Sequence, residues 1–303
     1  MSERPIIEKH IVAEVGDRVD RWVSKNFARL PTRGSARKAA KRGELLLNGQ
    51  VVESSRFVKL GDTVELMESA VRHPVYHLVP EVVHIDERCA IVIKPPGLLV
   101  NGNQHRTLEH ALPNALPPSS EPDALLAPRP VHRLDFETTG LLAVARCHRA
   151  MVAWGRAFEE RRVHKRYRAI VVGRLEGEGR VELPLDGREA VSRYRVIRSF
   201  HSLKTTWCTE VELEPLTGRM HQLRRHMQHL GYPILGDKRY HNGVIFRGAG
   251  IFLAAVHLDL PDPDGEGRIV AGIDPPYKFR SFQAREERRW ARWHATNGLP
   301  KES

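Results

Sequence analysis

The stretch VHRLDFETTGLLAVAR, residues 131–146, decides how the larger part of the chain folds. Its second half, residues 140–145, is apolar, which is typical of a buried β-strand. The residues just before that strand are charged or ionisable: His132, Arg133, Asp135 and Glu137. Because a rigid strand positions the side chains of the loop beside it, this arrangement indicates a functional site. A single Asp in such a loop is more often an ordinary capping carboxylate, so the position alone does not decide its role.

A second stretch, TGRMHQLRRHMQHLGYPILGDKRY at residues 217–240, combines basic side chains with a helical pattern. We expect a helix from Thr217 to Leu230. A carboxylate in a closed pocket has its pKa raised by burial above a reference of about 3.9, and a nearby Arg lowers that pKa again. Asp135 with Arg224 is therefore a chemically sensible pair, although spacing alone does not show that they meet.

The rest of this half of the chain alternates between strand-like and helical patterns. Strands are expected at residues 82–85, 90–93 and 163–172, and a helix at residues 150–160. Six prolines between residues 113 and 130 indicate a long surface loop and not a core element. The Arg-rich end, which includes Phe282, Trp290 and Trp293, is expected to form an amphipathic closing helix.

The first seventy residues read as a separate small unit, and residues 69–80 read as a linker. Asp17 is expected to cap a first helix, and Ser35 a second, shorter one. The sequence LLLNGQVV at residues 45–52 then carries Asn-Gly, a strong signal for a two-residue β-hairpin. A turn and a strand follow at residues 61–66.

The two predicted helices are strongly basic. Between residues 29 and 42 there are six basic residues and no acidic one: Arg29, Arg33, Arg37, Lys38, Lys41 and Arg42. The whole chain of 303 residues has 48 Lys and Arg against 37 Asp and Glu, which gives a formal net charge of +11. Such a balance favours a polyanionic partner, most often a nucleic acid, over a merely solvated helix face.

Several classes of function are disfavoured by what the sequence lacks. The three cysteines, Cys89, Cys147 and Cys208, are far apart and form no CxxC pair, so neither a zinc–thiolate site nor a disulfide framework is indicated. The N-terminus has no apolar signal region, and no run approaches the roughly 18 apolar residues of a membrane span. There is no GxxxxGK[ST] and no GxGxxG motif. We therefore expect a cytoplasmic protein, in a reducing environment, with no membrane contact and no cofactor.

The basic helix pair, the LLLNGQVV hairpin and the GDTVEL strand resemble the S4 RNA-binding module, also called the αL motif, over about residues 17–67. This resemblance implies that residues 1–75 are an RNA-binding domain with its linker. The basic residues that would contact RNA are Arg33, Arg37, Lys38, Lys41 and Arg42.

Four further motifs follow in order along the chain: IKPPGLLVN (93–101), HRLDFETTGLLAVAR (132–146), VHKRYRAIVVG (163–173) and TGRMHQLRRHMQHLGYPILGD (217–237). They resemble the successive motifs of the RluA family of pseudouridine synthases. The resemblance implies an α+β protein in which residues 76–303 form the catalytic domain. This domain would have a mixed, mainly antiparallel sheet flanked by helices, and a basic C-terminal helix.

The resemblance also implies roles for individual residues. Asp135 matches the catalytic aspartate, Tyr167 the tyrosine that stacks on the target base, and Arg224 the arginine that forms a salt bridge with the aspartate. Arg133 matches the arginine that takes part in flipping the nucleotide, and Leu223 lies at an apolar wall position.

Three stretches depart from the family pattern. VNGN replaces a His-Pro-Gly sequence at residues 100–103, Phe136-Glu137 follows the aspartate, and Thr139 replaces a Ser. The nucleophile and its partner are intact, and the departures concern flanks that can touch RNA.

The implied reaction breaks the N1–C1′ bond of uridine and rebuilds a C5–C1′ bond, so nothing is oxidised or reduced. A carboxylate suffices as nucleophile or as stabiliser of an oxocarbenium-like species. The uridine must leave its stack, which costs a few kcal/mol, and stacking on Tyr167 would return about 1–3 kcal/mol. Whether Asp135 attacks the sugar or the base is not decided by the sequence.

Two other functions compete with this interpretation. A metal-dependent RNA hydrolase would need ligands such as His221, His226 and His229, but no HExxH motif or acidic ligand accompanies them. A catalytically inactive RNA-binding or ribosome-assembly protein would be expected to have lost the Asp or the Arg, and both are present. We therefore expect an RNA pseudouridine synthase, acting as a monomer on structured RNA, with ribosomal RNA favoured over transfer RNA.

Overall fold

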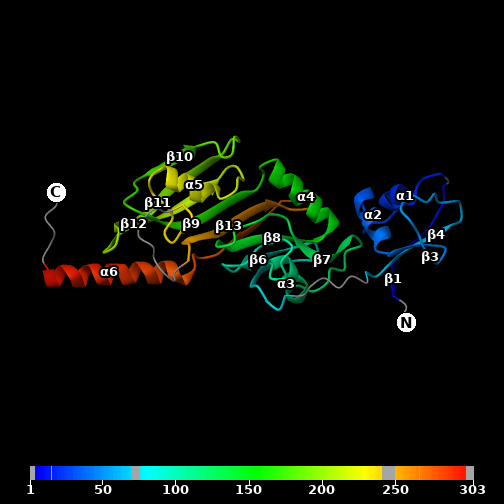
Figure 1. Ribbon diagram of the computed structural model, residues 1–303, viewed down its shortest axis with the longest axis horizontal. Helices are drawn as coiled ribbons and strands as arrows, with labels where there is room; N and C mark the ends of the chain where they lie inside the picture. The colour runs from blue at the N-terminus through cyan, green and yellow to red at the C-terminus, as the bar shows by residue number, and fades with distance from the viewer. Residues whose placement is uncertain (1–3, 15, 70–75, 241–249, 266, 298–303) are drawn as a thin grey trace.

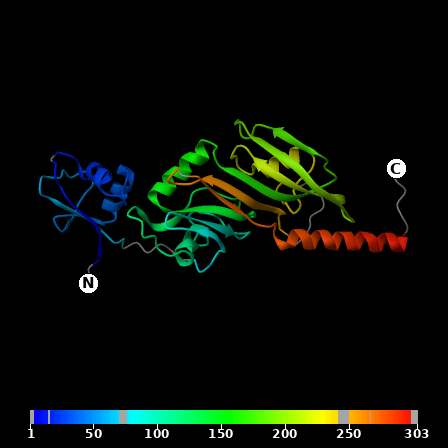
Figure 2. The ribbon, with the colours of Figure 1, turned by 180° about the vertical axis from the view of Figure 1, so that it is seen from behind.

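Two β-sheets, each with its own helices, organise the protein (Figure 1). The computed structural model describes residues 4–14, 16–69, 76–240, 250–265 and 267–297. In both ribbon views the N-terminal sheet lies at one end of an elongated molecule and the C-terminal helix at the other (Figures 1 and 2). The expected α+β class is confirmed.

The N-terminal unit is a four-stranded sheet packed against two helices, with strand order β1-β4-β2-β3. Its elements are β1 Ile6–Ile11, α1 Val19–Asn26, α2 Arg33–Lys41, β2 Leu45–Leu47, β3 Gln50–Val51 and β4 Thr63–Met67. The apolar residues of α1 and of the segment after it are all buried in a core of their own: Val19, Trp22, Val23, Phe27 and Leu30. Strand β1, which pairs with β4 at the edge of this sheet, was not predicted from the sequence.

The predicted hairpin is confirmed, but both predicted helix caps are wrong. Asn48 and Gly49 have φ of 52° and 78°, the left-handed pair that the short hairpin turn requires. The Asp17 side chain caps nothing and accepts a hydrogen bond from Lys25 Nζ at 2.7 Å. The second helix begins earlier, because Thr32 and Ser35 form a reciprocal capping box in which Thr32 is the N-cap.

The second sheet has ten strands, with order β10-β11-β12-β9-β13-β8-β6-β5, while β14 pairs with β13 and β7 with β8. Its strands are β5 Val82–Ile85, β6 Cys89–Lys94, β7 Ala124–Pro130, β8 Thr139–Cys147, β9 His164–Val172, β10 Glu178–Glu182, β11 Val191–Ser202, β12 Thr206–Pro215, β13 Leu253–Pro261 and β14 Arg268–Gly272. Among the described strands only β13 and β8 pair in parallel, so the expected mixed, mainly antiparallel sheet is confirmed.

Four helices cover the two faces of this sheet: α3 Leu108–Ala115, α4 His148–Glu159, α5 Gln222–His229 and α6 Tyr277–Asn297. Helices α3 and α5 share one apolar cluster with Leu142 of β8 and Tyr167 of β9. Leu141, which directly precedes Leu142, packs with α4 on the other face of the sheet. Helix α6 packs on that same face through Phe279 and Phe282, against Phe252.

Three predictions for this domain need correction. The predicted loop 113–130 contains the end of α3 and the whole of β7. Strand β7 tolerates Pro128 and Pro130 because it pairs on one side only, with β8. The helix predicted from Thr217 begins at Gln222 instead. The predicted linker 69–80 includes residues 70–75, which lie outside the described residues, while Tyr76 and Leu78 already pack on the second core.

The short parallel contact between β8 and β13 joins the two halves of the large sheet. Gly140 of β8 pairs with Ala255 of β13 and has φ of 118°. A Cβ atom at Gly140 would lie 2.1 Å from the Ala255 carbonyl oxygen, which is backbone and cannot move aside. Only glycine therefore lets the two strands meet here, five residues after Asp135.

We predict that Gly140→Ala destabilises the part of the protein built on the ten-stranded sheet by about 3 kcal/mol or more, because it adds a steric clash to a left-handed backbone. Gly177 has φ of +66°, but a Cβ atom there would meet nothing within 4 Å, so Gly177→Ala should cost only about 1–2 kcal/mol. Urea unfolding of both variants measures the difference, and equal losses would contradict the proposed close approach.

Candidate active site

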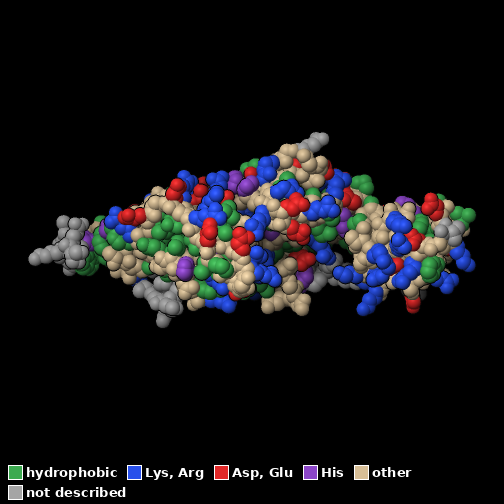
Figure 3. All heavy atoms as spheres, turned by 90° about the horizontal axis from the view of Figure 1, so that it is seen from above, with side chains coloured by type: hydrophobic (Ala, Val, Ile, Leu, Met, Phe, Trp, Pro, Cys, Tyr) green, Lys and Arg blue, Asp and Glu red, His purple; other side chains and the backbone are tan. Residues whose placement is uncertain are grey.

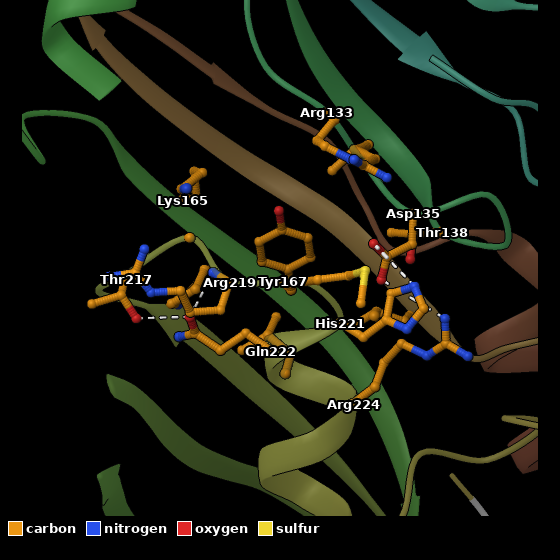
Figure 4. Close-up of a pocket in the computed structure, with 16 residues that line it drawn as sticks. Arg133, Asp135, Thr138, Lys165, Tyr167, Thr217, Arg219, His221, Gln222 and Arg224 are labelled. Carbon is orange, nitrogen blue, oxygen red and sulfur yellow. Dashed lines mark hydrogen bonds and ion pairs between the residues drawn. The ribbon is translucent and has the colours of Figure 1, made fainter. Parts of the chain in front are cut away.

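A pocket of about 250 Å³ opens where the loop before β8, strand β9 and the segment leading into α5 meet (Figure 4). The loop contributes Arg133, Asp135 and Thr138, and β9 contributes Lys165 and Tyr167. The third wall comes from Pro215, Thr217, Gly218, Arg219, Met220, His221, Gln222, Leu223 and Arg224. The structure thus brings Arg133, Asp135, Tyr167, Leu223 and Arg224, which the sequence singled out, to one pocket.

Asp135 lies at the edge of this pocket and faces two basic side chains. Its Oδ2 is 3.8 Å from Nη1 of Arg224, and its Oδ1 is 3.9 Å from Nε2 of His221. The Asp135 side chain keeps 19% of its surface exposed, so a ligand in the pocket can reach the carboxylate. The pairing of Asp135 with Arg224 is therefore a long ion pair and not a tight bidentate bond.

The tight partner of Arg224 is Asp237. Arg224 Nε donates to Asp237 Oδ2 at 2.6 Å, and Nη2 donates to Asp237 Oδ1 at 2.8 Å. Nη2 also donates to Glu137 Oε2 at 3.0 Å, which leaves Nη1 on the side of Asp135. Both members of the bidentate pair are buried. Burial would raise the pKa of Asp237, but the hydrogen bonds and the charge of Arg224 hold that pKa below its usual value.

Asp237 was not predicted as a site residue, although it ends the quoted motif TGRMHQLRRHMQHLGYPILGD. Physical reasoning could have identified Asp237, because a helix that buries a guanidinium needs a buried carboxylate as its partner. Asp237 also accepts the backbone N–H groups of Arg239 and Tyr240 at 3.0 and 3.1 Å. It therefore fixes both the arginine and the chain that follows.

Tyr167 is almost fully buried, and Figure 4 shows its ring between Lys165 and Asp135. Burial raises the pKa of its phenol, and the charge of Asp135 raises it further, so the hydroxyl stays protonated at neutral pH. Tyr167 shares the face of β9 with Ala169 and Val171. In a pocket wall, its ring can serve as a stacking surface and its protonated hydroxyl as a hydrogen-bond donor.

Lys94 contacts the Asp135 loop from strand β6, and it was also not predicted as a site residue. Its side chain is fully buried, and Nζ donates to the carbonyls of Pro95, Leu98 and Phe136 at 2.9, 2.8 and 3.2 Å. Burial lowers the pKa of Lys94 to about 8, while the charge of Asp135 opposes that shift. Because Phe136 follows Asp135 directly, the bond to its carbonyl ties the Asp135 loop to strand β6, and the other two bonds hold the turn that follows β6. The sequence indicated Lys94 only as a charged residue at the end of an apolar strand, within IKPPG at residues 93–97.

His221 occupies the turn that enters α5 and has a left-handed backbone, with φ of 53°. Its Nδ1 lies 3.0 Å from the Tyr240 hydroxyl, and the Arg224 guanidinium stacks over the Tyr240 ring at 5.2 Å. Burial lowers the pKa of His221, while Asp135 raises it. This strained turn explains why the helix predicted from Thr217 starts late, and it turns His221 towards Asp135.

The basic residues predicted to bind RNA are not at this pocket, except for Arg133, which is exposed at its mouth. Arg33, Arg37, Lys38, Lys41 and Arg42 belong to α2 and its end. Arg33 and Arg37 donate to the buried Asp20 at 3.2 and 2.7 Å, and Arg42 forms a bidentate pair with Glu44. Within the described residues Lys38 and Lys41 are exposed and form no ion pair.

No metal centre is built at the pocket by the described residues. His226 is buried, with Nδ1 3.0 Å from Ser192 Oγ and Nε2 3.1 Å from the Leu183 carbonyl oxygen. A separate group of His84, Asp86 and Cys89 brings its ligand atoms within 4.8 Å of one another. Asp86 there already accepts from Arg88 and from backbone N–H groups, and burial raises the pKa of the Cys89 thiol.

Comparison with known proteins identifies the family. The family model described as RNA pseudouridylate synthase matches residues 88–229. Ribosomal large subunit pseudouridine synthase D of Pseudomonas aeruginosa is 33% identical over 249 residues, which cover 74% of each chain. The chain belongs to the RNA pseudouridylate synthase family.

Two further comparisons agree with this membership. The enzyme of the same name from Xanthomonas campestris is 34% identical over 224 residues, and the match spans 66% of this chain but only 64% of that protein's length. The solved structure of Human RNA Pseudouridylate Synthase Domain Containing 4 is 25% identical, with a TM-score of 0.55 over 69% of this chain and 93% of the human one. The segment matched by the family model contains Asp135, Tyr167 and Arg224, but neither Asp237 nor the N-terminal unit.

In the part of the chain that the structure describes, no helix is both long enough and apolar enough to span a membrane.

We predict that Asp237→Asn lowers the free energy of unfolding by about 3 kcal/mol, because it leaves the buried Arg224 without its closest counter-charge. Asp186→Asn is the matched control, since Asp186 pairs with Arg225 of the same helix but keeps 62% of its side chain exposed. That variant should cost less than about 1 kcal/mol.

Acid titration supplies a second test of the same pair. The pKa of Asp237 is lowered in the folded protein, so its stabilisation is fully present above the unfolded value of about 3.9 and is lost as the pH falls below it. Urea unfolding at pH 6 and at pH 3.5 should therefore show a steeper loss in the wild type than in Asp237→Asn. Identical pH profiles would show that Asp237 does not carry this charge.

Proposed function

We propose that this protein isomerises uridine to pseudouridine in structured RNA, with large-subunit ribosomal RNA as the favoured substrate and Asp135 as the catalytic carboxylate. The observation that carries the proposal is the accessible Asp135 carboxylate, which faces a buried arginine in the pocket of a family member. Relatives named ribosomal large subunit pseudouridine synthase D supply the reason to favour ribosomal RNA over transfer RNA.

The chemistry needs only groups that this pocket offers. The N1–C1′ bond breaks, the uracil turns, C5 bonds to C1′, the proton on C5 is lost, and N1 gains a proton. Asp135 stabilises the sugar or the base while the ring is detached. Arg224 places a positive charge beside that carboxylate, with Nη1 3.8 Å from Asp135 Oδ2.

Two other residues would handle the flipped nucleotide. Tyr167 offers a ring in the pocket wall, on which a base can stack with about 1–3 kcal/mol. Arg133 is exposed at the mouth, where a guanidinium can take the space that the uridine leaves or bind a neighbouring phosphate.

The N-terminal unit would hold the RNA outside the pocket. We propose residues 1–75 as the S4-like RNA-binding domain with its linker, and residues 76–303 as the catalytic domain. Figure 3 shows Lys and Arg side chains gathered over the visible face of the N-terminal unit, at the right. Lys38 and Lys41 are the strongest candidates for phosphate contacts, because no ion pair with a described residue competes for them.

We predict that Asp135→Asn abolishes turnover while RNA binding is retained, since the substitution removes a charge at the reacting centre and little contact area. The measurement is a pseudouridine map of total RNA from cells that lack the protein and carry either the wild type or the variant. Positions restored by the wild type alone would name the substrate. Equal rescue by the variant would instead favour an RNA-binding or assembly role without catalysis.

We predict that Lys38→Gln with Lys41→Gln weakens RNA binding and reduces the slope of log K against log salt by about 1.4–1.8, or roughly 0.7–0.9 per phosphate contact. The control is Arg33→Gln, because Arg33 already donates to Asp20 and should change the slope less. Filter binding across a salt series measures all three. An unchanged slope in the double variant would refute the RNA-binding role of α2.

A further inference from the structure

Helix α6 carries a basic face that no part of the catalytic pocket uses. The helix contains six Lys and Arg against two Glu. Four of its arginines recur at positions i, i+3, i+4 and i+7, which lie on one side of a helix: Arg285, Arg288, Arg289 and Arg292. All four are exposed. Over seven residues this face is about 10 Å long.

The inner side of α6 is anchored firmly, which fixes the direction of that basic face. Phe282 packs in the cluster beneath the sheet, and Glu286 is fully buried, accepting a hydrogen bond from Ser202 Oγ at 2.8 Å. One turn further on, the Trp290 ring stacks on His201 with a centroid distance of 4.3 Å and an interplanar angle of 7°. His201 in turn lies 3.7 Å from the Trp207 ring.

The arginines differ in what they already bind. Arg285 and Arg289 lie 3.5 and 3.3 Å from the buried Glu286, so part of their charge is used to stabilise the fold. Arg288 and Arg292 form no ion pair with any residue that the structure describes. Their charge is therefore fully available to a ligand.

An aromatic side chain accompanies this free charge. Trp293 follows Arg292 and keeps 43% of its surface exposed, close to the end of the helix. Both ribbon views show α6 extending past the strands at the end of the molecule opposite the N-terminal unit (Figures 1 and 2). Trp293 follows the buried Glu286 by seven residues, so it lies on the anchored side of α6, about 100° round the helix from Arg292. Exposed guanidinium groups bind phosphates, and an exposed indole near the same helix end can stack on bases in single-stranded or loop RNA.

We propose that the outer face of α6, with Arg288 and Arg292 as its phosphate contacts, is a second RNA-binding surface, and that RNA passing round the end of the helix also reaches Trp293. This surface would hold a part of the substrate RNA distant from the part bound by the N-terminal unit. The inference rests on the proposed function, because the polyanion is taken to be the RNA in which uridine is isomerised. RNA is favoured over an acidic protein because the guanidinium groups match phosphate and the exposed Trp293 ring near the end of the helix offers a stacking surface.

The test compares RNA binding by the full-length wild type and by Arg288→Gln with Arg292→Gln. The probe is a fluorescently labelled transcript of large-subunit ribosomal RNA, titrated by anisotropy across a salt series. The salt slope should fall by about 1.4–1.8, because two phosphate contacts are lost. The matched control, Arg288→Lys with Arg292→Lys, keeps both charges and should keep nearly all of the slope.

Trp293 gives an independent arm of the same experiment. Trp293→Ala should weaken binding by about five-fold or more with the salt slope unchanged, while Trp293→Phe should retain most of the affinity through its ring. Far-ultraviolet circular dichroism and urea unfolding confirm that each variant is folded.

Each outcome decides the proposal. Wild-type affinity and slope in the double Gln variant would overturn it, as would equal losses in the Gln and Lys variants, because charge would then not be the cause. Turnover of the wild type is measured on the same transcript. Absence of pseudouridine there would contradict the proposed function, whereas the binding comparison would still test α6.

Discussion

The buried guanidinium of Arg224 is the interaction on which the site depends. It joins Asp237 to Asp135 and Glu137 of the loop before β8, about a hundred residues earlier in the chain, and it has a different geometry with each. The two short bonds to Asp237 fix the plane of the guanidinium, so its remaining nitrogen points to Asp135 without any tight bond of its own. Asp135 therefore faces a fixed positive charge and makes no short bond to it, so its carboxylate remains free to contact a ligand in the pocket.

The large sheet holds Asp135 and Tyr167 at fixed positions relative to each other. Asp135 precedes β8, Tyr167 lies on β9, and both strands neighbour β13. The close approach of β8 to β13 depends on Gly140, where any side chain would strike the backbone of Ala255. Lys94, at the end of β6, ties the loop before β8 to that strand through the Phe136 carbonyl, and it also donates to the Pro95 and Leu98 carbonyls. The pocket is thus a consequence of the rigid junction between the two halves of the sheet.

The sequence predicted the segments that have a strong local pattern and missed those defined by distant partners. Strand β8, helix α4 and the Asn48-Gly49 hairpin follow from periodicity and turn chemistry, and all are confirmed. Strand β7 was hidden by prolines that only its one-sided pairing makes tolerable. Asp135, Tyr167 and Arg224 were singled out through a family resemblance. Asp237 and Lys94 were missed, because each matters through a buried contact that only the folded chain brings about: Asp237 with Arg224, and Lys94 with the Phe136 carbonyl.

The sequence shows how many basic residues the protein has, but only the fold shows which of them are already paired with carboxylates. A net charge of +11 suggests a broad basic surface, but many of the arginines are bound internally, as Arg37 is to Asp20 and Arg168 to Glu210. Counting basic residues in a helix therefore overstates what is available to RNA. A sharper criterion is an exposed cation without a carboxylate partner, preferably beside an exposed aromatic ring. Among the described residues that satisfy it are Lys38 and Lys41 at one end of the molecule and Arg288 and Arg292 at the other. Under the proposed function, the two ends would bind separate parts of one folded RNA while the pocket between them would admit a single uridine.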